Sequence, residues 1–432
     1  MKSEPFRIAL AGLGTVGAGV VKIVQKNGEL LARRAGRPIE IVSVSARDKN
    51  KDRGVDLSSY SWIDNAVQMA DSNGVDAVVE MIGGSDGPAL ALTQTALGRG
   101  LHVVTANKAM LAHHGYELAK MAESNNAALM FEAAVAGGIP IIKSMREGYA
   151  ANEIQAVYGI LNGTCNYILT EMRETGRDFA DVLKDAQAKG YAEADPSFDV
   201  DGVDAGHKLC LLSALAFGTR PDFASLTMTG IRQINKTDIA FAGELGYRIK
   251  LLGMARRTNG RVIQLLEPCL VPVQSPLGTV EGVYNAVMVE GDFVKTGLSE
   301  GRGAGEGPTA SAIIADIIDL ARGQRVPTFG VPATDLIKPD WADIKDTISS
   351  YYMRLTVLDQ PGVIADVSAI LRDHRISIEG FIQRGRDPGQ PVPVVITTHE
   401  TRHGDVLAAC DAIAKLSCSV EKPCLLRIED IG

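Results

Sequence analysis

The sequence predicts an α/β protein made of a doubly wound parallel sheet, an α+β domain and a small C-terminal domain of βαββαβ order. Three observations support this fold class. Strand patterns alternate with helical patterns over the first 150 residues, a proline-containing and then polar stretch follows at 327–345, and strand and helix patterns resume after it. The 432 residues allow two to four domains, and a hydrophobic content of 46% is sufficient for their cores.

The first strand and the turn after it form a recognisable unit. Residues 7–11 read as a buried strand, and residues 16–24 carry apolar side chains at helical spacing. Between them, Gly12 permits a tight turn, Gly14 lets backbone N–H groups approach a pyrophosphate, and Gly17 allows close helix packing. This context predicts a Rossmann-type dinucleotide site; the alternative is a glycine-rich turn without a ligand. The residues expected to contact the cofactor here are Gly12, Leu13, Gly14, Thr15, Val16 and Gly17.

The end of the second strand bears on which nicotinamide cofactor binds. This strand, residues 39–45, is followed by Arg47 and Asp48. A carboxylate at this place binds the ribose 2′-hydroxyl of NAD, whereas an arginine accommodates the 2′-phosphate of NADP. We expect NADP because of Arg47, with NAD as the alternative because of Asp48. Both residues could instead belong to a solvated turn.

The next elements alternate as a parallel sheet requires. Strands are predicted at 75–82, 101–105 and 128–132, with helices at 87–98 and 113–124. Ligands bind at the carboxyl ends of such strands, where this chain places Gly83, Lys108 and Glu132. Any one of these residues could lie in an ordinary turn, but together they predict the rim of one cleft.

A second polar cluster begins after a predicted strand at 155–161. Gly163 and Thr164 follow this strand, and a carboxylate-rich loop precedes a helix that starts near residue 203. In that helix Asp204 and Lys208 are four residues apart, so they share one face. The alternative is an exposed ion pair worth about 0.3 kcal/mol. A lysine among carboxylates suits proton transfer to a carbonyl oxygen, and the carboxylates suit an ammonium group; His207 points to another face and is expected to be structural.

Composition excludes several classes of partner. The net charge of −8 gives no basic field, so nucleic acid is not expected as a partner. Six scattered cysteines without CxxC pairs fit a reducing compartment and argue against a zinc site. The N-terminal residues lack a signal-peptide h-region and no stretch is long and apolar enough for a bilayer, so we expect no membrane contact and a cytoplasmic location.

The C-terminal segment, which we expect to be separable, again shows strand patterns that alternate with helix patterns. A strand alternates at 352–358, a turn reaches Gly362, and the next helix has one apolar face. The remaining patterns complete a βαββαβ order at 376–382, 392–398, 406–416 and 425–428.

Together these residues resemble the homoserine dehydrogenases, in the bacterial form with a C-terminal regulatory ACT domain. The resemblance covers almost the whole chain. Its motifs are the glycine turn and residues 104–108 (VTANK), 132–140, 162–166 (NGTCN), 190–208 and 301–312. It implies a cofactor domain at 1–150, completed by about 303–335, a substrate and dimerisation domain at 151–302, and an ACT domain at 349–432.

The resemblance also implies a role for particular residues. In similar enzymes, Lys208 is the proton donor, Glu193 and Asp204 hold the amino acid, and Lys108 lies between cofactor and substrate. The further positions implied are Asp199, Gly163 and Thr164 for substrate, Arg47, Gly83, Gly303 and Glu306 for cofactor, and Glu132, Val135, Gly137 and Ile139 for a monovalent cation, usually Na⁺.

The implied function is NAD(P)H-dependent interconversion of L-aspartate 4-semialdehyde and L-homoserine, in threonine, methionine and isoleucine biosynthesis. The ACT-like segment implies an amino-acid effector near Gly362, with threonine the natural candidate, or else a bare dimerisation module; a homodimer or homotetramer is expected. Two other functions stay open. One is a non-catalytic sensor of nucleotide and amino acid, which loss of Lys208 would favour; the other is a dehydrogenase of a related amino-acid aldehyde, for which residues 193–196 are the discriminating segment.

Overall fold

The computed structural model describes residues 4–258, 260–384 and 387–431. Their contacts divide the chain into two compact units. Unit 1 comprises Met1–Gly163, Asp204–Leu226 and Val283–Pro339, and unit 2 comprises Thr164–Val203, Thr227–Gly282 and Asp340–Gly432. The predicted domain at 151–302 is shared between these units, and the three-domain division stays a prediction.

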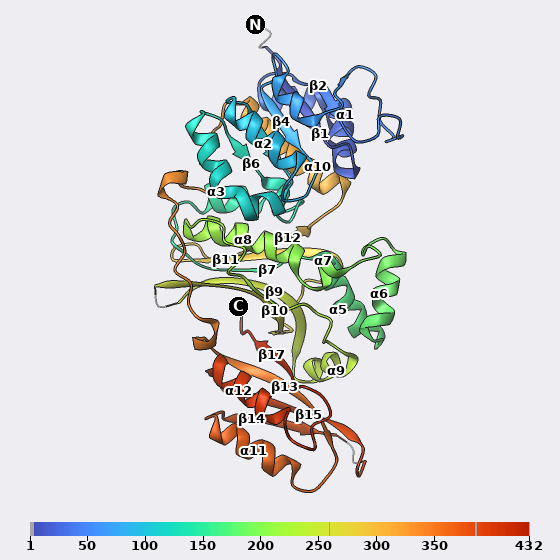
Figure 1. Ribbon diagram of the computed structural model, residues 1–432, viewed down its shortest axis with the longest axis vertical. Coiled ribbons are helices and arrows are strands. Elements are labelled where there is room, and N and C mark those ends of the chain that lie inside the picture. Colours follow the sequence, from blue (N-terminus) through green and yellow to red (C-terminus); the bar gives the residue numbers. More distant parts are fainter. Residues whose placement is uncertain (1–3, 259, 385–386, 432) are drawn as a thin grey trace. The chain divides into compact units, whose positions relative to one another are not determined.

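Unit 1 contains a six-stranded parallel sheet (Figure 1) in the order β3-β2-β1-β4-β5-β6. Its strands are β1 (Phe6–Ala11), β2 (Ile39–Ser45), β3 (Ser61–Trp62), β4 (Ala77–Glu80), β5 (His102–Thr105) and β6 (Leu129–Met130). Strand order reverses between β1 and β4, which is the place where doubly wound sheets bind their ligands. The predicted doubly wound parallel sheet is confirmed.

Helices connect and cover these strands: α1 (Thr15–Ala35), α2 (Pro88–Gly98), α3 (Lys108–Ser124) and α10 (Glu306–Ala321). Helix α10 packs against α1, although almost 300 residues separate their first residues. Val20 of α1 and Ile313 of α10 belong to the same fully buried cluster as Ile8 and Leu10 of β1. Helix α10, although late in the sequence, therefore completes the core beneath the glycine turn.

Two element boundaries differ from the predicted ones. The strand expected at 128–132 is limited to β6, because Glu132 begins the 3-10 helix η2 (Glu132–Ala134). Helix α3 begins at Lys108 instead of near residue 113, since the Asn107 side chain caps it by accepting a hydrogen bond from the Met110 N–H at 3.1 Å. Lys108 thus stands in the first turn of a helix.

The rest of unit 1 contains three antiparallel strands in the order β12-β11-β7. They are β7 (Ile154–Ile160), β11 (Tyr284–Gly291) and β12 (Lys295–Arg302). Helix α8 (Val203–Phe217) belongs to unit 1 from Asp204 onward. Shorter elements are η1 (Ala66–Asp71), α4 (Ile141–Lys143), the π-helical turn η3 (Ser144–Gly148) and η4 (Ala333–Asp335).

Unit 2 begins with helices and a long hairpin. The helices are α5 (Gly163–Thr175, within this unit from Thr164), α6 (Phe179–Ala188), α7 (Ser197–Val200) and α9 (Lys236–Glu244). The hairpin pairs β9 (Tyr247–Thr258) with β10 (Arg261–Pro272), and the short β8 (Thr227–Met228) also pairs with β10.

The C-terminal part of unit 2 has the predicted βαββαβ order. Its elements are η5 (Ile344–Asp346), β13 (Ile348–Leu358), α11 (Val363–Asp373), β14 (Ile378–Gln383), β15 (Pro391–Thr398), the short β16 (Thr401–Arg402), α12 (His403–Ile413) and β17 (Cys424–Ile428). The two helices pack on the strands around a core of their own that includes Val367, Val394 and Val406.

The C-terminal segment shares a sheet with the hairpin of unit 2, and its expected separability stays a prediction. β17 pairs in parallel with β10, with Cys269 opposite Arg427 and Leu270 opposite Ile428. One sheet therefore runs β9-β10-β17-β13-β15-β14 through unit 2. The polar composition of the linker indicates an exposed connection, but it carries no information about which strand edges pair afterwards.

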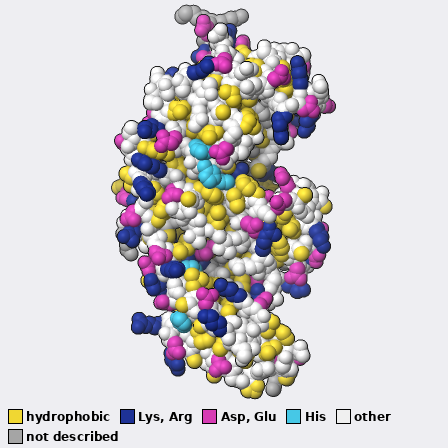
Figure 2. All heavy atoms as spheres, in the orientation of Figure 1, with side chains coloured by type: hydrophobic (Ala, Val, Ile, Leu, Met, Phe, Trp, Pro, Cys, Tyr) yellow, Lys and Arg dark blue, Asp and Glu magenta, His cyan; other side chains and the backbone are white. Residues whose placement is uncertain are grey.

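Charged side chains of both signs are interspersed over the described part of the face that Figure 2 shows, without one extended field of either sign. Among the described residues no helix is long and apolar enough to cross a membrane.

Candidate active site

The glycine turn lies between β1 and α1. Gly12 has a φ of +100°, and a Cβ there would lie 2.5 Å from the Met81 carbonyl oxygen. A Cβ on Gly17 would lie 2.1 Å from the Gly12 carbonyl oxygen, whereas the space beside Gly14 is open to 4 Å. Gly14 precedes α1, and no side chain caps that helix. The turn therefore presents backbone N–H groups at a helix N-terminus, which suits a phosphate.

The loop after β2 is rich in basic side chains. Arg47 and Asp48 are both exposed, so their side chains are available to a ligand. Arg53, which sequence analysis missed, reaches back to the glycine turn and donates from Nε to the Leu13 carbonyl oxygen at 3.0 Å. It also lies over the Trp62 ring. The signal for it was present, because residues 47–53 contain four Lys or Arg.

A buried cluster joins the ends of three segments of unit 1. Lys208 donates from Nζ to Asp204 Oδ2 and to the Leu161 carbonyl oxygen, both at 2.7 Å. Lys108 Nζ lies 3.2 Å from Asp204 Oδ1. Asn162, which the sequence analysis did not single out, donates from Nδ2 to Asp204 Oδ2 at 2.9 Å. One carboxylate thus holds two ammonium groups.

Burial decides between the two interpretations of the helical pair. The side chains of Asp204 and Lys208 are only 10% and 9% exposed, so the pair is not a surface ion pair. Although burial opposes ionisation of Asp204, the charges of Lys208 and Lys108 hold its pKa well below its usual range. Asp204 is therefore ionised at neutral pH and stabilises positive charge beside it.

His207 lies apart from this cluster, packed between the rings of His113 and Phe223 at centroid distances of 5.5 and 4.3 Å. Burial, and then the charges of His113 and Lys108, lower the pKa of His207 to about 4. A neutral ring in an aromatic stack fits the structural role expected for it.

Glu132 belongs to a second cluster of buried polar side chains in unit 1. Its Oε1 and Oε2 accept hydrogen bonds from the Ile142 and Lys143 N–H groups at 3.0 and 2.9 Å. Its own N–H donates to Asp316 Oδ2, and Lys143 pairs with both Asp316 and Asp319. Burial and the charge of Asp316 raise the pKa of Glu132 to about 7. Sequence analysis did not connect Asp316 with this group, because 184 residues separate it from Glu132.

The segment after Glu132 is the one for which the sequence predicts a monovalent cation. Ala136 has a φ of +50°, which is rare for a residue with a side chain and marks local strain. Val135 and Gly137 flank it, and the Ile139 carbonyl oxygen accepts a hydrogen bond from the Ile141 N–H at 2.7 Å. A hollow of about 390 Å³ borders Glu132 and Gly137. Among the described residues no three His, Cys, Asp or Glu side chains gather as metal ligands, so carbonyl oxygens with one carboxylate form the fitting donor set.

The expected loop at Gly303 is tightly fitted to unit 1. A Cβ on Gly303 would lie 1.9 Å from Asn285 Oδ1, and one on Gly163 would lie 2.7 Å from the Val283 carbonyl oxygen. Glu306, the first residue of α10, forms an ion pair with Lys22 of α1, with 2.7 Å between Oε1 and Nζ. Gly83 follows β4 with a φ of +84° and open space around it.

The other expected substrate residues, and the expected effector residue Gly362, lie in unit 2. Thr164 donates from Oγ1 to the Tyr191 carbonyl oxygen at 2.7 Å. Glu193 is exposed, and its backbone oxygen accepts from Gln187. The Asp199 carbonyl oxygen accepts from the Cys165 thiol. Gly362, with a φ of +94°, precedes α11 as its N-cap and has open space around its Cβ position.

Comparison with protein families gives three matches. The family model described as homoserine dehydrogenase matches residues 140–318. The model described as the NAD-binding domain of homoserine dehydrogenase matches residues 12–132, and the ACT domain model matches residues 351–418.

Individual relatives agree over nearly the full length. The chain is 44% identical to a homoserine dehydrogenase of Neisseria gonorrhoeae, with 99% of each chain covered. It superposes on a crystal structure of a homoserine dehydrogenase from Thiobacillus denitrificans with a TM-score of 0.93 at 42% identity, again covering 99% of each chain. A hyperthermophilic archaeal homoserine dehydrogenase, solved in complex with NADPH, matches 73% of this chain and 97% of its own, with a TM-score of 0.63 and 26% identity.

Proposed function

The chain belongs to the homoserine dehydrogenase family, and from this premise we propose that it interconverts L-aspartate 4-semialdehyde and L-homoserine with a nicotinamide cofactor. The observation that carries the proposal is the buried cluster of Lys208, Asp204 and Lys108, in the same unit as the glycine turn. The test is an assay of purified protein with aspartate semialdehyde and NADPH or NADH in parallel, followed by the absorbance of the reduced nicotinamide. A non-catalytic sensor would give no turnover.

Each residue of the buried cluster has its own role in the proposed reaction. When bound, the cofactor supplies the hydride that reaches the aldehyde carbon. Lys208 donates the proton to the aldehyde oxygen, which completes the alcohol, and in the reverse direction its neutral form accepts that proton. Asp204 holds Lys208 in place through their 2.7 Å hydrogen bond, and Lys108 adds positive charge where the oxygen becomes negative.

Substrate recognition is assigned to the carboxylate-rich loop. The roles implied by the family are negative charge from Glu193 and Asp204 for the substrate's ammonium group, and substrate binding by Asp199, Gly163 and Thr164. In the domain division that goes with this function, residues 1–150 with 303–335 bind the cofactor, 151–302 bind substrate and form a dimer or tetramer, and 349–432 regulate. The enzyme would act in the cytoplasm, in the pathway to threonine, methionine and isoleucine. Size-exclusion chromatography with light scattering tests the oligomeric state.

We further propose NADP as the preferred cofactor. The exposed Arg47 after β2 is available to a 2′-phosphate, and a similar enzyme has been solved with NADPH. Arg47→Ala is expected to weaken NADP binding by about 1 to 3 kcal/mol, the range for a charge-assisted hydrogen bond, with NAD affinity nearly unchanged. Titration of both nucleotides measures this, and Arg33→Ala in the last turn of α1 is a control that leaves selectivity unchanged. If NADP/NAD selectivity is unaltered in Arg47→Ala, the role passes to Asp48 or to Arg53.

A monovalent cation, Na⁺ by preference, would bind Glu132 and the carbonyl oxygens of Val135, Gly137 and Ile139. It would fix the strained segment around Ala136 and so the peptide that leads into α4. Exchange of Na⁺ for tetramethylammonium at constant chloride is expected to lower thermal stability in the native enzyme. Glu132→Gln should abolish that difference; an equal loss in both proteins would refute the site.

The ACT domain supports regulation by a small molecule, and we propose L-threonine as an inhibitor. The turn at Gly362 opens α11, so N–H groups of its first turn can receive the effector's carboxylate. Gly362→Asp is expected to abolish inhibition without changing kcat in the absence of threonine. Because an aspartate at positive φ is strained anywhere, Gly323→Asp in unit 1, where φ is +81°, is the matched control. Full threonine sensitivity in Gly362→Asp would exclude this turn as the effector site.

A further inference from the structure

A small cavity lies in unit 2 at the start of β9, away from every residue assigned above. Helix α5, helix α9 and β9 supply its walls. It is lined by Leu169, Thr170, Arg173, Ile239, Tyr247, Arg248, Ile249 and Lys250. The centre of a water-sized particle can move within about 10 Å³ of it, so the cavity has room for one particle somewhat larger than water.

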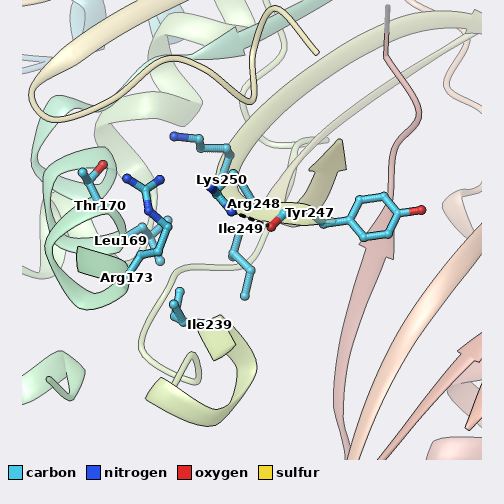
Figure 3. Close-up of a pocket in the computed structure, with 8 residues that line it drawn as sticks. All are labelled: Leu169, Thr170, Arg173, Ile239, Tyr247, Arg248, Ile249 and Lys250. Atoms are coloured by element: carbon cyan, nitrogen blue, oxygen red, sulfur yellow. Dashed lines mark hydrogen bonds between the residues drawn. The ribbon is translucent and has the colours of Figure 1, made fainter. Parts of the chain in front are cut away.

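Three of the lining side chains are cationic. Figure 3 shows Arg173 on α5 facing the side chains of Arg248 and Lys250 on β9, while the ring of Tyr247 points away. Arg248 and Lys250 are two residues apart in a strand, so they share one face. Lys250 is 2% exposed and Arg173 22% exposed, which places their charges in a region of low screening.

The Glu281 carboxylate contacts two of these cations. Glu281 Oε1 accepts from Arg173 Nη1 at 2.5 Å, and Glu281 Oε2 lies 3.7 Å from Lys250 Nζ. The remaining contacts of Lys250 are neutral, with the Val280 carbonyl and with Asn166 Oδ1 at 3.2 Å. Among the described residues Arg248 has no ion pair, and its Nη1 donates to the Tyr247 carbonyl at 3.4 Å.

Arg173 Nη2 also lies 3.1 Å from Oε1 of the exposed Glu174, so three cations face two carboxylates and the site keeps a net positive charge. Burial lowers the pKa of Lys250 to about 8; Glu281 opposes this shift, but Arg173 and Arg248 reinforce it. A lysine that two neighbouring arginines disfavour is a sign of uncompensated positive potential. A single negative charge in the cavity would be attracted by all three cations and would stabilise the folded unit.

We propose that this cavity binds one small inorganic anion, of the size of chloride, between Arg173, Arg248 and Lys250. The Thr170 hydroxyl and the apolar side chains of Leu169 and Ile239 complete its surroundings. A tetrahedral oxyanion such as sulfate exceeds the available space. The bound anion is an integral part of the junction between α5 and α9.

The position of the anion connects two helices of unit 2. Helix α5 starts at Gly163, and Ile239 on α9 directly follows Asp238, whose Oδ1 accepts from Arg354 Nε of β13 at 2.8 Å. The anion thus touches α5, which begins at the proposed substrate residues Gly163 and Thr164, and α9, which holds the C-terminal domain.

Two measurements test the proposal on the full chain. Crystals soaked in sodium bromide should show an anomalous peak in the cavity, within hydrogen-bond distance of Arg248. Thermal unfolding in sodium chloride should exceed that in sodium gluconate by about 2 to 4 °C at equal ionic strength, because a ligand of the folded state raises stability. Sodium is the cation in both salts, so the site at Glu132 does not contribute.

Variants separate the cavity from general salt effects. Arg248→Gln should lose the chloride-dependent shift, whereas Arg257→Gln, an exposed position on the same strand, should keep it. Sodium sulfate, which stabilises folded proteins generally, should raise the unfolding temperature of Arg248→Gln and of the native protein equally. No bromide peak in the cavity, or an equal chloride-dependent shift in Arg248→Gln and the native protein, would each overturn the proposal.

Discussion

Lys208→Ala is expected to lower kcat by about 10²- to 10⁴-fold, the contribution typical of a positioned general acid. The side chain is 9% exposed, and within the described part of the chain its Nζ donates to two acceptors, Asp204 and the Leu161 carbonyl. One N–H therefore remains for the substrate oxygen. Steady-state kinetics with the aldehyde, and a separate titration of the cofactor, measure the effect. Cofactor affinity should change little, because Lys208 belongs to α8 and not to the glycine turn.

A matched substitution distinguishes chemistry from binding. Glu193→Gln removes a proposed countercharge for the substrate's ammonium group, so it should raise KM for the aldehyde more than it lowers kcat. In Lys208→Ala the remaining Lys108 and Asn162 still contact Asp204, so the carboxylate keeps partners and the fold is retained. Near-native kcat in Lys208→Ala would contradict its assignment as the proton donor.

Asp238→Ala is expected to destabilise unit 2 by about 3 to 5 kcal/mol, the loss typical when one partner of a buried ion pair is removed. Asp238 is fully buried in α9. Its Oδ1 accepts from Arg354 Nε at 2.8 Å and from the Tyr352 hydroxyl at 3.1 Å, and its Oδ2 accepts from the Asn235 N–H. Urea unfolding followed by circular dichroism measures the change.

The same helix provides the control. Glu244 at the end of α9 pairs with Arg384, but both side chains are exposed, at 40% and 65%. Glu244→Gln should therefore change stability by no more than about 0.5 kcal/mol, since solvent screens such a pair. If the two substitutions cost the same, the Asp238 contacts do not anchor the C-terminal domain.

The sequence predicted the parts of the fold whose causes are local. The strand before Gly12 and the turn after it were recognisable because apolar periodicity and glycine geometry act within a few residues. The start of α3 was missed because its cap, Asn107, was treated as part of the strand exit. The order of the C-terminal elements was predicted for the same local reasons.

The contacts that complete the candidate site were not predictable in this way. Lys108 and Asp204 are 96 positions apart, and nothing in either segment specifies that their side chains meet. Glu132 with Asp316, and Asp238 with Arg354, are likewise joined only by the tertiary fold. Residue type and spacing indicated the chemistry, and packing alone determined the partners.

The pairing of β17 with β10 has a consequence for how the chain is made. About 150 residues separate these strands, so β10 leaves the ribosome long before the strand that will cover its edge exists. An uncovered strand edge is a template for association with other chains, and a contact between such distant segments forms slowly. The short β8 covers β10 at Leu265 and Leu266, whereas Cys269 and Leu270 wait for β17, so a nascent chain that ends before Cys424 leaves the end of β10 open to association.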